Sequence, residues 1–154
     1  YYTPDEADKY DYLNGYSDAM SLSGLVFSGV NAAWLGKEIP SGVLGGILTA
    51  RDIANLDFKG TDLVMLSACK TAQGNVTAEG LYGLQRAFKK AGAGTLILTL
   101  WKVRDSVAES FATTFYKELM NQEGNKRQAF EKTKDIIREK FKDSFDWACF
   151  VMVD

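Results

Sequence analysis

Two continuous apolar runs constrain the fold of this chain more than any other feature of its sequence. DLVMLSA at residues 62–68 and TLILTLW at residues 95–101 show no alternation of polar and apolar residues. Such runs are typical of strands that are covered on both faces in a parallel sheet. A third run, ACFVMV at residues 148–153, predicts a further strand that closes the chain.

Helical patterns occupy the intervals between these strands. Residues 78–91 carry apolar side chains spaced three and four apart, and Gly92 is placed to end that helix. Asp105 is predicted to cap a second helix, and Asn125 with Gln128 resembles a capping box for a third. The inward stripes are predicted to be Ala108, Phe111, Phe115 and Leu119 in the second helix, and Phe130, Thr133, Ile137 and Phe141 in the third. This alternation predicts an α/β sandwich with a mostly parallel sheet.

The N-terminal part of the chain is predicted to form loops and a small sheet. Residues 23–29 are a short strand candidate, residues 41–46 a flexible turn, and Thr49 with Asp52 predicts the start of a short helix. Three apolar strands alone would leave an unpaired edge, which folded proteins usually avoid. Because the chain also begins at Tyr1, we expect it to be a fragment whose sheet has further strands on the N-terminal side.

Composition excludes several function classes. The 154 residues are 46% hydrophobic and 25% charged, as in one globular domain, and the net charge of −2 comes from dispersed charges that do not favour nucleic acid. No uncharged apolar run is long enough to span a membrane, so a membrane is not an expected partner. The two cysteines, Cys69 and Cys149, form no CxxC pair, so we expect no disulfide scaffold, metal or cofactor, and a cytoplasmic location.

Cys69 lies where the first apolar run ends, and ligands of open α/β sheets gather beyond such strand ends. Its residue type fits either a nucleophile or a small buried hydrophobe. Trp101 ends the second run and fits either a pocket wall or the core. Cys149 lies within the last run and is predicted to be core. The chain contains no histidine that could accept the proton of a thiol.

Four short motifs together resemble the CHAT domain, a caspase- and separase-related module that is usually attached to TPR repeats. They are Ser-Ala-Cys-x-Thr at 67–71, Glu-Gly at 79–80, Leu-Trp at 100–101 and Trp-Ala-x-Phe at 147–150. The resemblance extends over residues 22–153. It implies a three-layer caspase-like sandwich, with residues 1–154 forming the C-terminal portion of a single domain.

The resemblance also implies a function. Cys69 would be the nucleophile of a cysteine endopeptidase, with Ser67, Trp101 and Lys102 binding a protein or peptide substrate. The partner histidine is expected in a His-Gly pair upstream of Tyr1, so these residues alone are predicted to be inactive. A degenerate scaffold or protein-interaction module is the alternative, and a redox-sensing cysteine is a third hypothesis. Attached TPR-type repeats and the missing N-terminal half of the domain are the expected partners.

The sequence departs from the usual family pattern around the proposed cleft. Lys70, Lys102 and Arg104 predict a basic rim that either attracts acidic residues or is a solvated surface without selectivity. Ser67 is small and neutral where a relative with basic specificity would carry an acid. We therefore expect a neutral or apolar residue before the scissile bond, with acidic residues tolerated around it.

Overall fold

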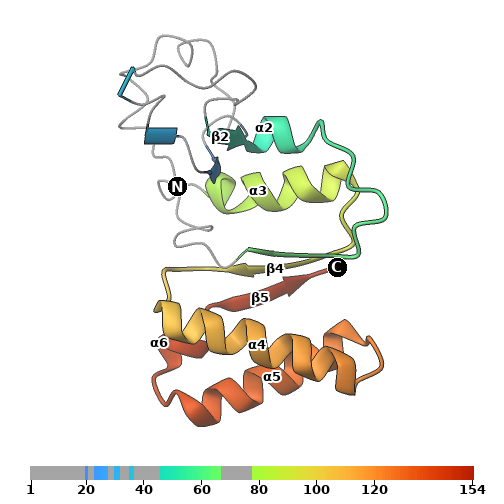
Figure 1. Ribbon diagram of the computed structural model, residues 1–154, viewed down its shortest axis with the longest axis vertical. Helices are drawn as coiled ribbons and strands as arrows, with labels where there is room; N and C mark the ends of the chain where they lie inside the picture. Colours follow the sequence, from blue (N-terminus) through green and yellow to red (C-terminus); the bar gives the residue numbers. More distant parts are fainter. Residues whose placement is uncertain (1–19, 21–22, 28–29, 32–34, 37–45, 67–77) are drawn as a thin grey trace. The chain divides into compact units, whose positions relative to one another are not determined.

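The computed structural model describes residues 20, 23–27, 30–31, 35–36, 46–66 and 78–154 (Figure 1). The chain divides into two compact units. The first comprises Tyr1–Asp62 and Ala72–Gly94, and the second comprises Leu63–Thr71 and Thr95–Asp154. The candidate residues Ser67, Cys69 and Lys70 lie outside the described residues, as does most of the turn predicted at 41–46.

The first unit begins with a small antiparallel sheet. Strand β1 (Gly24–Val26) pairs with β2 (Ile47–Thr49), which confirms a strand within residues 23–29. Helix α2 (Ala50–Ile53) follows at once, and the Asp52 backbone N–H donates to Thr49 Oγ1 at 3.1 Å. The Thr49 backbone N–H donates in return to the Asp52 carboxylate at 2.9 Å, so the predicted cap is a complete capping box.

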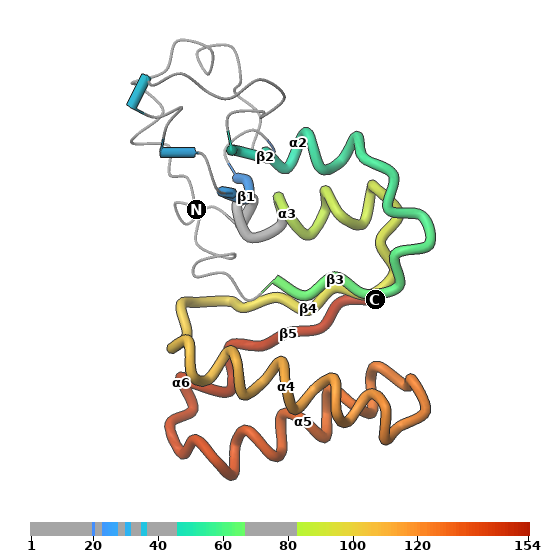
Figure 2. Tube along the Cα trace, viewed as in Figure 1, coloured from blue at the N-terminus to red at the C-terminus, as the bar shows by residue number. Residues whose placement is uncertain are grey.

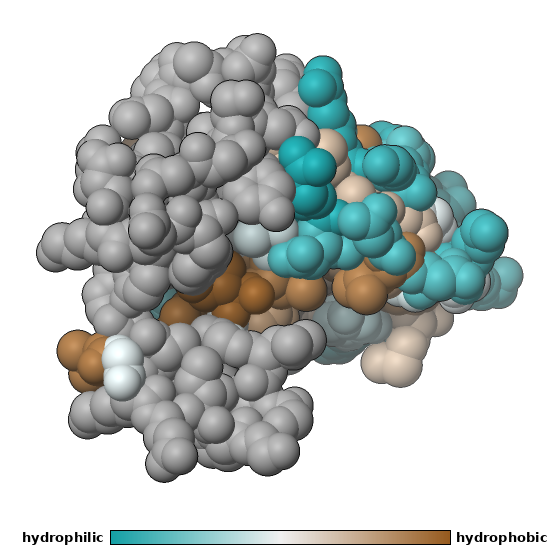
Figure 3. Space-filling view, turned by 90° about the horizontal axis from the view of Figure 1, so that it is seen from above, coloured by the Kyte–Doolittle hydropathy of each residue, from teal (hydrophilic) through white to brown (hydrophobic). Residues whose placement is uncertain are grey.

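Helix α3 (Ala78–Ala91) also belongs to the first unit and ends where the sequence predicted. Gly92 follows with a φ of +101°, a backbone conformation that favours glycine. The apolar face of α3 buries Phe88, whose ring meets the ring of Phe58 edge-on at 5.1 Å between centroids. The described surface around α2 and α3 is largely hydrophilic with smaller apolar areas (Figure 3).

The second unit contains a three-stranded sheet in the order β3 (Leu63–Leu66), β4 (Thr95–Thr99), β5 (Phe150–Val153). All five residues of β4 are buried, which confirms the prediction for that run. The residues of β3 are each only partly buried, because among the described strands β3 pairs with β4 alone. The full coverage predicted for residues 62–68 is therefore wrong for the described part of that run.

Helices α4 (Asp105–Asn121) and α5 (Lys126–Lys140) lie side by side in the second unit. The α4 cap differs from the prediction, because Arg104 is the N-cap and Asp105 is already the first helical residue. Asn125 does cap α5, accepting a hydrogen bond from the Gln128 N–H at 3.1 Å, which is one of the two hydrogen bonds of the predicted capping box. A short helix, α6 (Ser144–Trp147), precedes β5.

The sheet of the second unit is mixed rather than mostly parallel. Strands β3 and β4 are parallel, whereas β5 is antiparallel to β4. The reason is the hairpin of the two long helices α4 and α5, which follows β4 and is visible in the tube of Figure 2. Two antiparallel helices return the chain to the end of the sheet at which it left, so β5 must run in the opposite direction to β4.

Aromatic side chains dominate the core of the second unit. Phe111 of α4 stacks on Phe150 of β5 with 3.7 Å between ring centroids and 6° between ring planes. The predicted inward stripes of α4 and α5 are confirmed. The buried members of this cluster are Ile97, Val103, Val107, Phe111, Phe115, Ala129, Phe130, Ile137, Cys149 and Phe150.

Candidate active site at the carboxyl ends of strands β3 and β4

Strands β3 and β4 end together at one edge of the sheet. Their register pairs Leu63 with Thr95 and Leu66 with Leu98. Loops that follow parallel strands at such an edge can bring side chains and backbone N–H groups to a shared site. Ser67 and Cys69 follow β3 in the sequence, and the loop after β4 carries Trp101 and Lys102.

Trp101 is held by a hydrogen bond and a ring contact with Phe145. Its side chain is partly buried, and its indole Nε1–H donates to the Phe145 backbone carbonyl oxygen at 2.7 Å. The rings of Trp101 and Phe145 lie 5.2 Å apart with 33° between their planes. Phe145 itself is 58% exposed, so this aromatic pair reaches the surface of the second unit.

Arg104 forms a two-pronged ion pair with Asp146. Its Nε donates to Asp146 Oδ1 at 3.1 Å, and its Nη2 donates to Oδ2. The Asp146 side chain is 8% exposed, whereas that of Arg104 is 65% exposed. The hydrogen bond to Asp146 and the attraction of its charge raise the pKa of Arg104.

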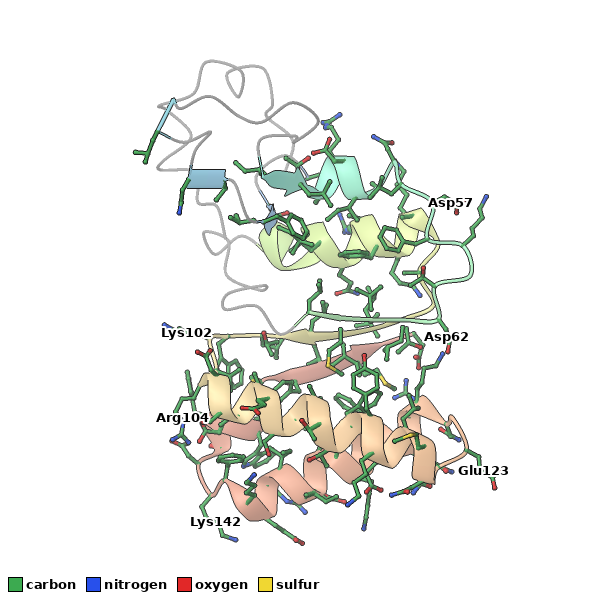
Figure 4. All side chains as sticks on the ribbon, viewed as in Figure 1. Asp57, Asp62, Lys102, Arg104, Glu123 and Lys142 are labelled. Carbon is green, nitrogen blue, oxygen red and sulfur yellow. The ribbon has the colours of Figure 1, made fainter. Side chains whose placement is uncertain are left out.

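The ion pair changes the interpretation of the predicted basic rim. Arg104 does not present a lone positive charge, because the carboxylate of Asp146 compensates it. Lys102 is exposed, and Figure 4 shows it at the same end of the second unit as Arg104 and Lys142, with Glu123 at the opposite end. Among the described residues, the basic rim predicted from the sequence therefore rests on Lys102.

Comparison with known proteins assigns the family. A family model described as "CHAT domain" matches residues 13–154. The chain belongs to the CHAT domain family. Tetratricopeptide repeat protein 28 of Mus musculus is 35% identical over 108 residues, and its Homo sapiens counterpart is 34% identical over 110 residues. Each match covers 70% of this chain and 4% of the relative. No solved structure matches the chain.

Cys149 of this CHAT domain is a core residue, as the sequence predicted. It has no exposed surface, and its Sγ lies 3.5 Å from the Asp146 carbonyl oxygen. Burial is the main cause that raises the pKa of the Cys149 thiol to about 11. The thiol is therefore protonated at neutral pH, which makes it a poor nucleophile.

Sequence reasoning missed α6 and with it two residues that contact the β4 loop, Phe145 and Asp146. A local signal was present, because Asp143 precedes the helix as its N-cap and its Oδ1 accepts from the Phe145 N–H at 2.9 Å. The helix is only four residues long, so it has no apolar periodicity to reveal it. In the described part of this CHAT domain, no cluster of three or more acidic, cysteine or histidine side chains could hold a metal. No helix within the described ranges has the length and apolar character needed to cross a membrane.

Proposed function

We propose that this CHAT domain is the cysteine-bearing part of a cysteine endopeptidase, with Cys69 as its nucleophile. The paired ends of β3 and β4 support the proposal, because the chain leaves both strands at the same edge of the sheet. Cys69 follows Leu66 by three residues, a chain length that reaches at most about 11 Å. Trp101 stands the same three residues beyond Leu98, the partner of Leu66.

The proposed chemistry is acyl transfer to a thiol. A base removes the proton of Cys69, and the thiolate attacks the carbonyl carbon of a peptide bond. The same base, now protonated, donates its proton to the leaving amine, and water then releases the acyl group. The backbone N–H of Cys69 would stabilise the oxyanion, a contribution of roughly 3 kcal/mol per donor in proteases.

The base must come from outside these residues if it is a histidine, because the chain contains none. We propose a His-Gly pair in a longer protein, together with helical repeats like those in the names of the two relatives. The chain spans about 4% of those relatives, which leaves ample length for both. A cytoplasmic location, where thiols stay reduced, fits a thiol nucleophile.

Ser67, Trp101 and Lys102 are the proposed substrate-binding residues. The partly buried Trp101 ring would contact the substrate, and the small hydroxyl of Ser67 brings no charge to the pocket. A neutral or apolar residue before the scissile bond is therefore the proposed preference. Arg104 is compensated by Asp146, so Lys102 is the described residue that would attract a flanking acidic residue.

A peptide-library assay on a longer protein that contains this domain and the upstream histidine tests the proposal. We expect cleavage after neutral or apolar residues, complete loss in Cys69→Ala and retention in Cys149→Ala. Cleavage that survives Cys69→Ala would refute the assignment of the nucleophile. Strong selection for Arg or Lys before the cleaved bond would refute the proposed specificity.

A second candidate function is a protein-interaction module that has kept the fold without the chemistry. The absence of histidine from all 154 residues favours it, and the relatives named for their repeats are equally compatible with it. Under this hypothesis the longer protein lacks a His-Gly pair after an apolar strand upstream of Tyr1. Sequencing that upstream region discriminates between the two functions.

A further inference from the structure

The loop after β4, residues 100–104, is held by α6 and by a residue that follows it, all from far along the chain. Residues of α6 make two side-chain contacts with it, at sequence separations of 44 for Trp101–Phe145 and 42 for Arg104–Asp146. A backbone hydrogen bond adds to these, because the Leu100 N–H donates to the Cys149 carbonyl oxygen at 2.9 Å. The loop is thus attached at its first residue, at its aromatic residue and at its last residue.

The ion pair attaches the loop through a carboxylate that is almost fully buried. Asp146 is 6% exposed, and a buried carboxylate is costly unless a cation and hydrogen bonds compensate it. Arg104 supplies two hydrogen bonds in a fork whose planar geometry fixes both partners. Its guanidinium also lies 5.8 Å from the centroid of the Phe141 ring, so the arginine is held from two sides.

The position of Trp101 depends on the same helix. Its indole N–H has the Phe145 carbonyl as acceptor, and this acceptor adjoins Asp146 in the chain. If Asp146 lost its hold on Arg104, α6 and the loop would separate at one attachment and the Trp101 hydrogen bond would open more often. Lys102 lies between Trp101 and Arg104 in the same loop and would move with them.

We infer that α6 is the positioning element of the proposed substrate site, with Asp146 holding the loop through Arg104 and the Phe145 carbonyl holding Trp101. This inference rests on the proposed function for the substrate that Trp101 would contact. Asp146 touches neither substrate nor nucleophile in this scheme, so it is a positioning residue. Weakening it should raise KM for a peptide several-fold and leave the reactivity of the Cys69 thiol toward a small reagent unchanged.

Asp146→Asn is the test variant, because it removes the charge and keeps the shape. Asp154→Asn is the matched control, since Asp154 pairs with Arg127 on the exposed surface and is not part of the loop contacts. Arg104→Lys keeps the positive charge that the buried carboxylate needs and loses the fork, so it provides a milder variant if Asp146→Asn does not fold.

Three measurements are made on each variant. Nuclear magnetic resonance of the 154-residue chain follows hydrogen exchange at the Trp101 indole, and iodoacetamide measures the alkylation rate of Cys69. Peptide kinetics use the longer protein that supplies the histidine. We expect at least fivefold faster indole exchange and a raised KM in Asp146→Asn or Arg104→Lys, with kcat and alkylation near wild type and no change in Asp154→Asn.

The outcomes separate this inference from the proposed function. Unchanged indole exchange in both test variants would overturn the positioning role, whatever the peptidase assay shows. Faster exchange with an unchanged KM would overturn its link to the substrate. A wild-type protein without any peptidase activity would refute the proposed function, and the indole exchange would still decide whether α6 holds Trp101.

Discussion

At the residue scale, the two cysteines occupy different positions, because Cys149 directly precedes β5 and Cys69 follows the end of β3 in the sequence. Cys149 is fully buried in the aromatic core and keeps its proton because an apolar environment disfavours the thiolate. Cys69 follows the end of a partly buried strand at a sheet edge. The sequence alone assigned Cys149 to the core correctly, because an apolar run surrounds it, whereas Cys69 stays a proposal.

The buried thiol of Cys149 predicts a dependence of stability on alkaline pH. Its pKa is about 11 in the folded chain, whereas the pKa of a cysteine in an unfolded chain is about 8.5. Between these values the unfolded chain has lost a proton that the folded chain retains, so the free energy of unfolding falls as pH rises. Below about pH 8.5 both states hold the proton, and the contribution is fully present.

Urea unfolding at a series of pH values from 7 to 11 measures this effect. We expect the free energy of unfolding of Cys149→Ala to fall less steeply above about pH 8.5 than that of the wild type. Lysines and tyrosines titrate in the same range, but both proteins share them. Parallel curves over the whole range would show that burial does not hold the proton on Cys149.

Arg104 shows where reasoning from the sequence failed at this scale. Its partner Asp146 is 42 residues away, so no local pattern could reveal that the charge is compensated. The sequence around Trp101 fits either the core or a pocket wall. In the structure its side chain is partly buried and donates a hydrogen bond to the distant Phe145 carbonyl. Such pairings depend on how the chain returns to the sheet, which only the three-dimensional structure shows.

At the scale of elements, most helix ends were predicted correctly from nearby residues, whereas the direction of β5 was predicted wrongly. The caps at Thr49 and Asn125 and the end of α3 at Gly92 each depend on residues within a few positions. These were predicted correctly, whereas the cap predicted at Asp105 lies one residue earlier, at Arg104. The direction of β5 depends instead on the hairpin of α4 and α5, which returns the chain to the carboxyl end of β4. Both helices were predicted, but the mostly parallel sheet did not take their antiparallel arrangement into account.

The end of α3 gives a prediction that separates the cost of backbone strain from the cost of a steric contact. Gly92 has a φ of +101°, and an added Cβ would lie 3.2 Å from the Lys59 backbone nitrogen. Gly60 has a φ of +89°, but an added Cβ there would meet nothing within 4 Å. We expect Gly60→Ala to cost about 1–2 kcal/mol from strain alone and Gly92→Ala to cost more.

Thermal or urea unfolding of the two glycine variants measures the difference. Because both positions require a left-handed backbone, the comparison cancels most of the strain and leaves the contact with Lys59. Equal losses would mean that the backbone near Lys59 relaxes without cost. A larger loss at Gly60 would contradict the prediction.

Packing between α4 and β5 gives a second prediction at this scale. Phe111 is 1% exposed and stacks on Phe150, so Phe111→Ala should lower the free energy of unfolding by about 3–5 kcal/mol. Tyr116 lies on the same helix and is 50% exposed, so Tyr116→Ala should cost about 1 kcal/mol or less. Urea unfolding compares them, and similar losses would contradict the core as described.

At the scale of the whole molecule, the absence of histidine governs what these residues can do alone. A thiol with a pKa of about 8.5 is only a few per cent ionised at neutral pH. The chain contains no histidine whose imidazole could remove the thiol proton. We expect no measurable peptide cleavage by the 154-residue chain. Substantial cleavage that Cys69→Ala abolishes would show that the chain needs no external histidine.

Alkylation of the same chain tests the two cysteines directly, although we expect no peptide cleavage. Iodoacetamide followed by mass spectrometry should modify Cys69 slowly and leave Cys149 unmodified until the chain unfolds, because Cys149 has no exposed surface. The chain has only these two cysteines, so each site can be followed without mutation. Modification of Cys149 before unfolding would contradict its burial.

The antiparallel direction of β5 determines how far a label on the last residue lies from the candidate site. Val153 pairs with Leu96, and the Thr95 hydroxyl donates to Asp154 Oδ1 at 3.0 Å, so the last residue lies beside the beginning of β4. The candidate site follows the other end of β4, about 13 Å away at 3.3 Å per residue. A fluorophore or affinity tag joined through a flexible linker to Asp154 would leave the sheet at the edge remote from Trp101, which suits immobilising the chain for peptide-binding measurements.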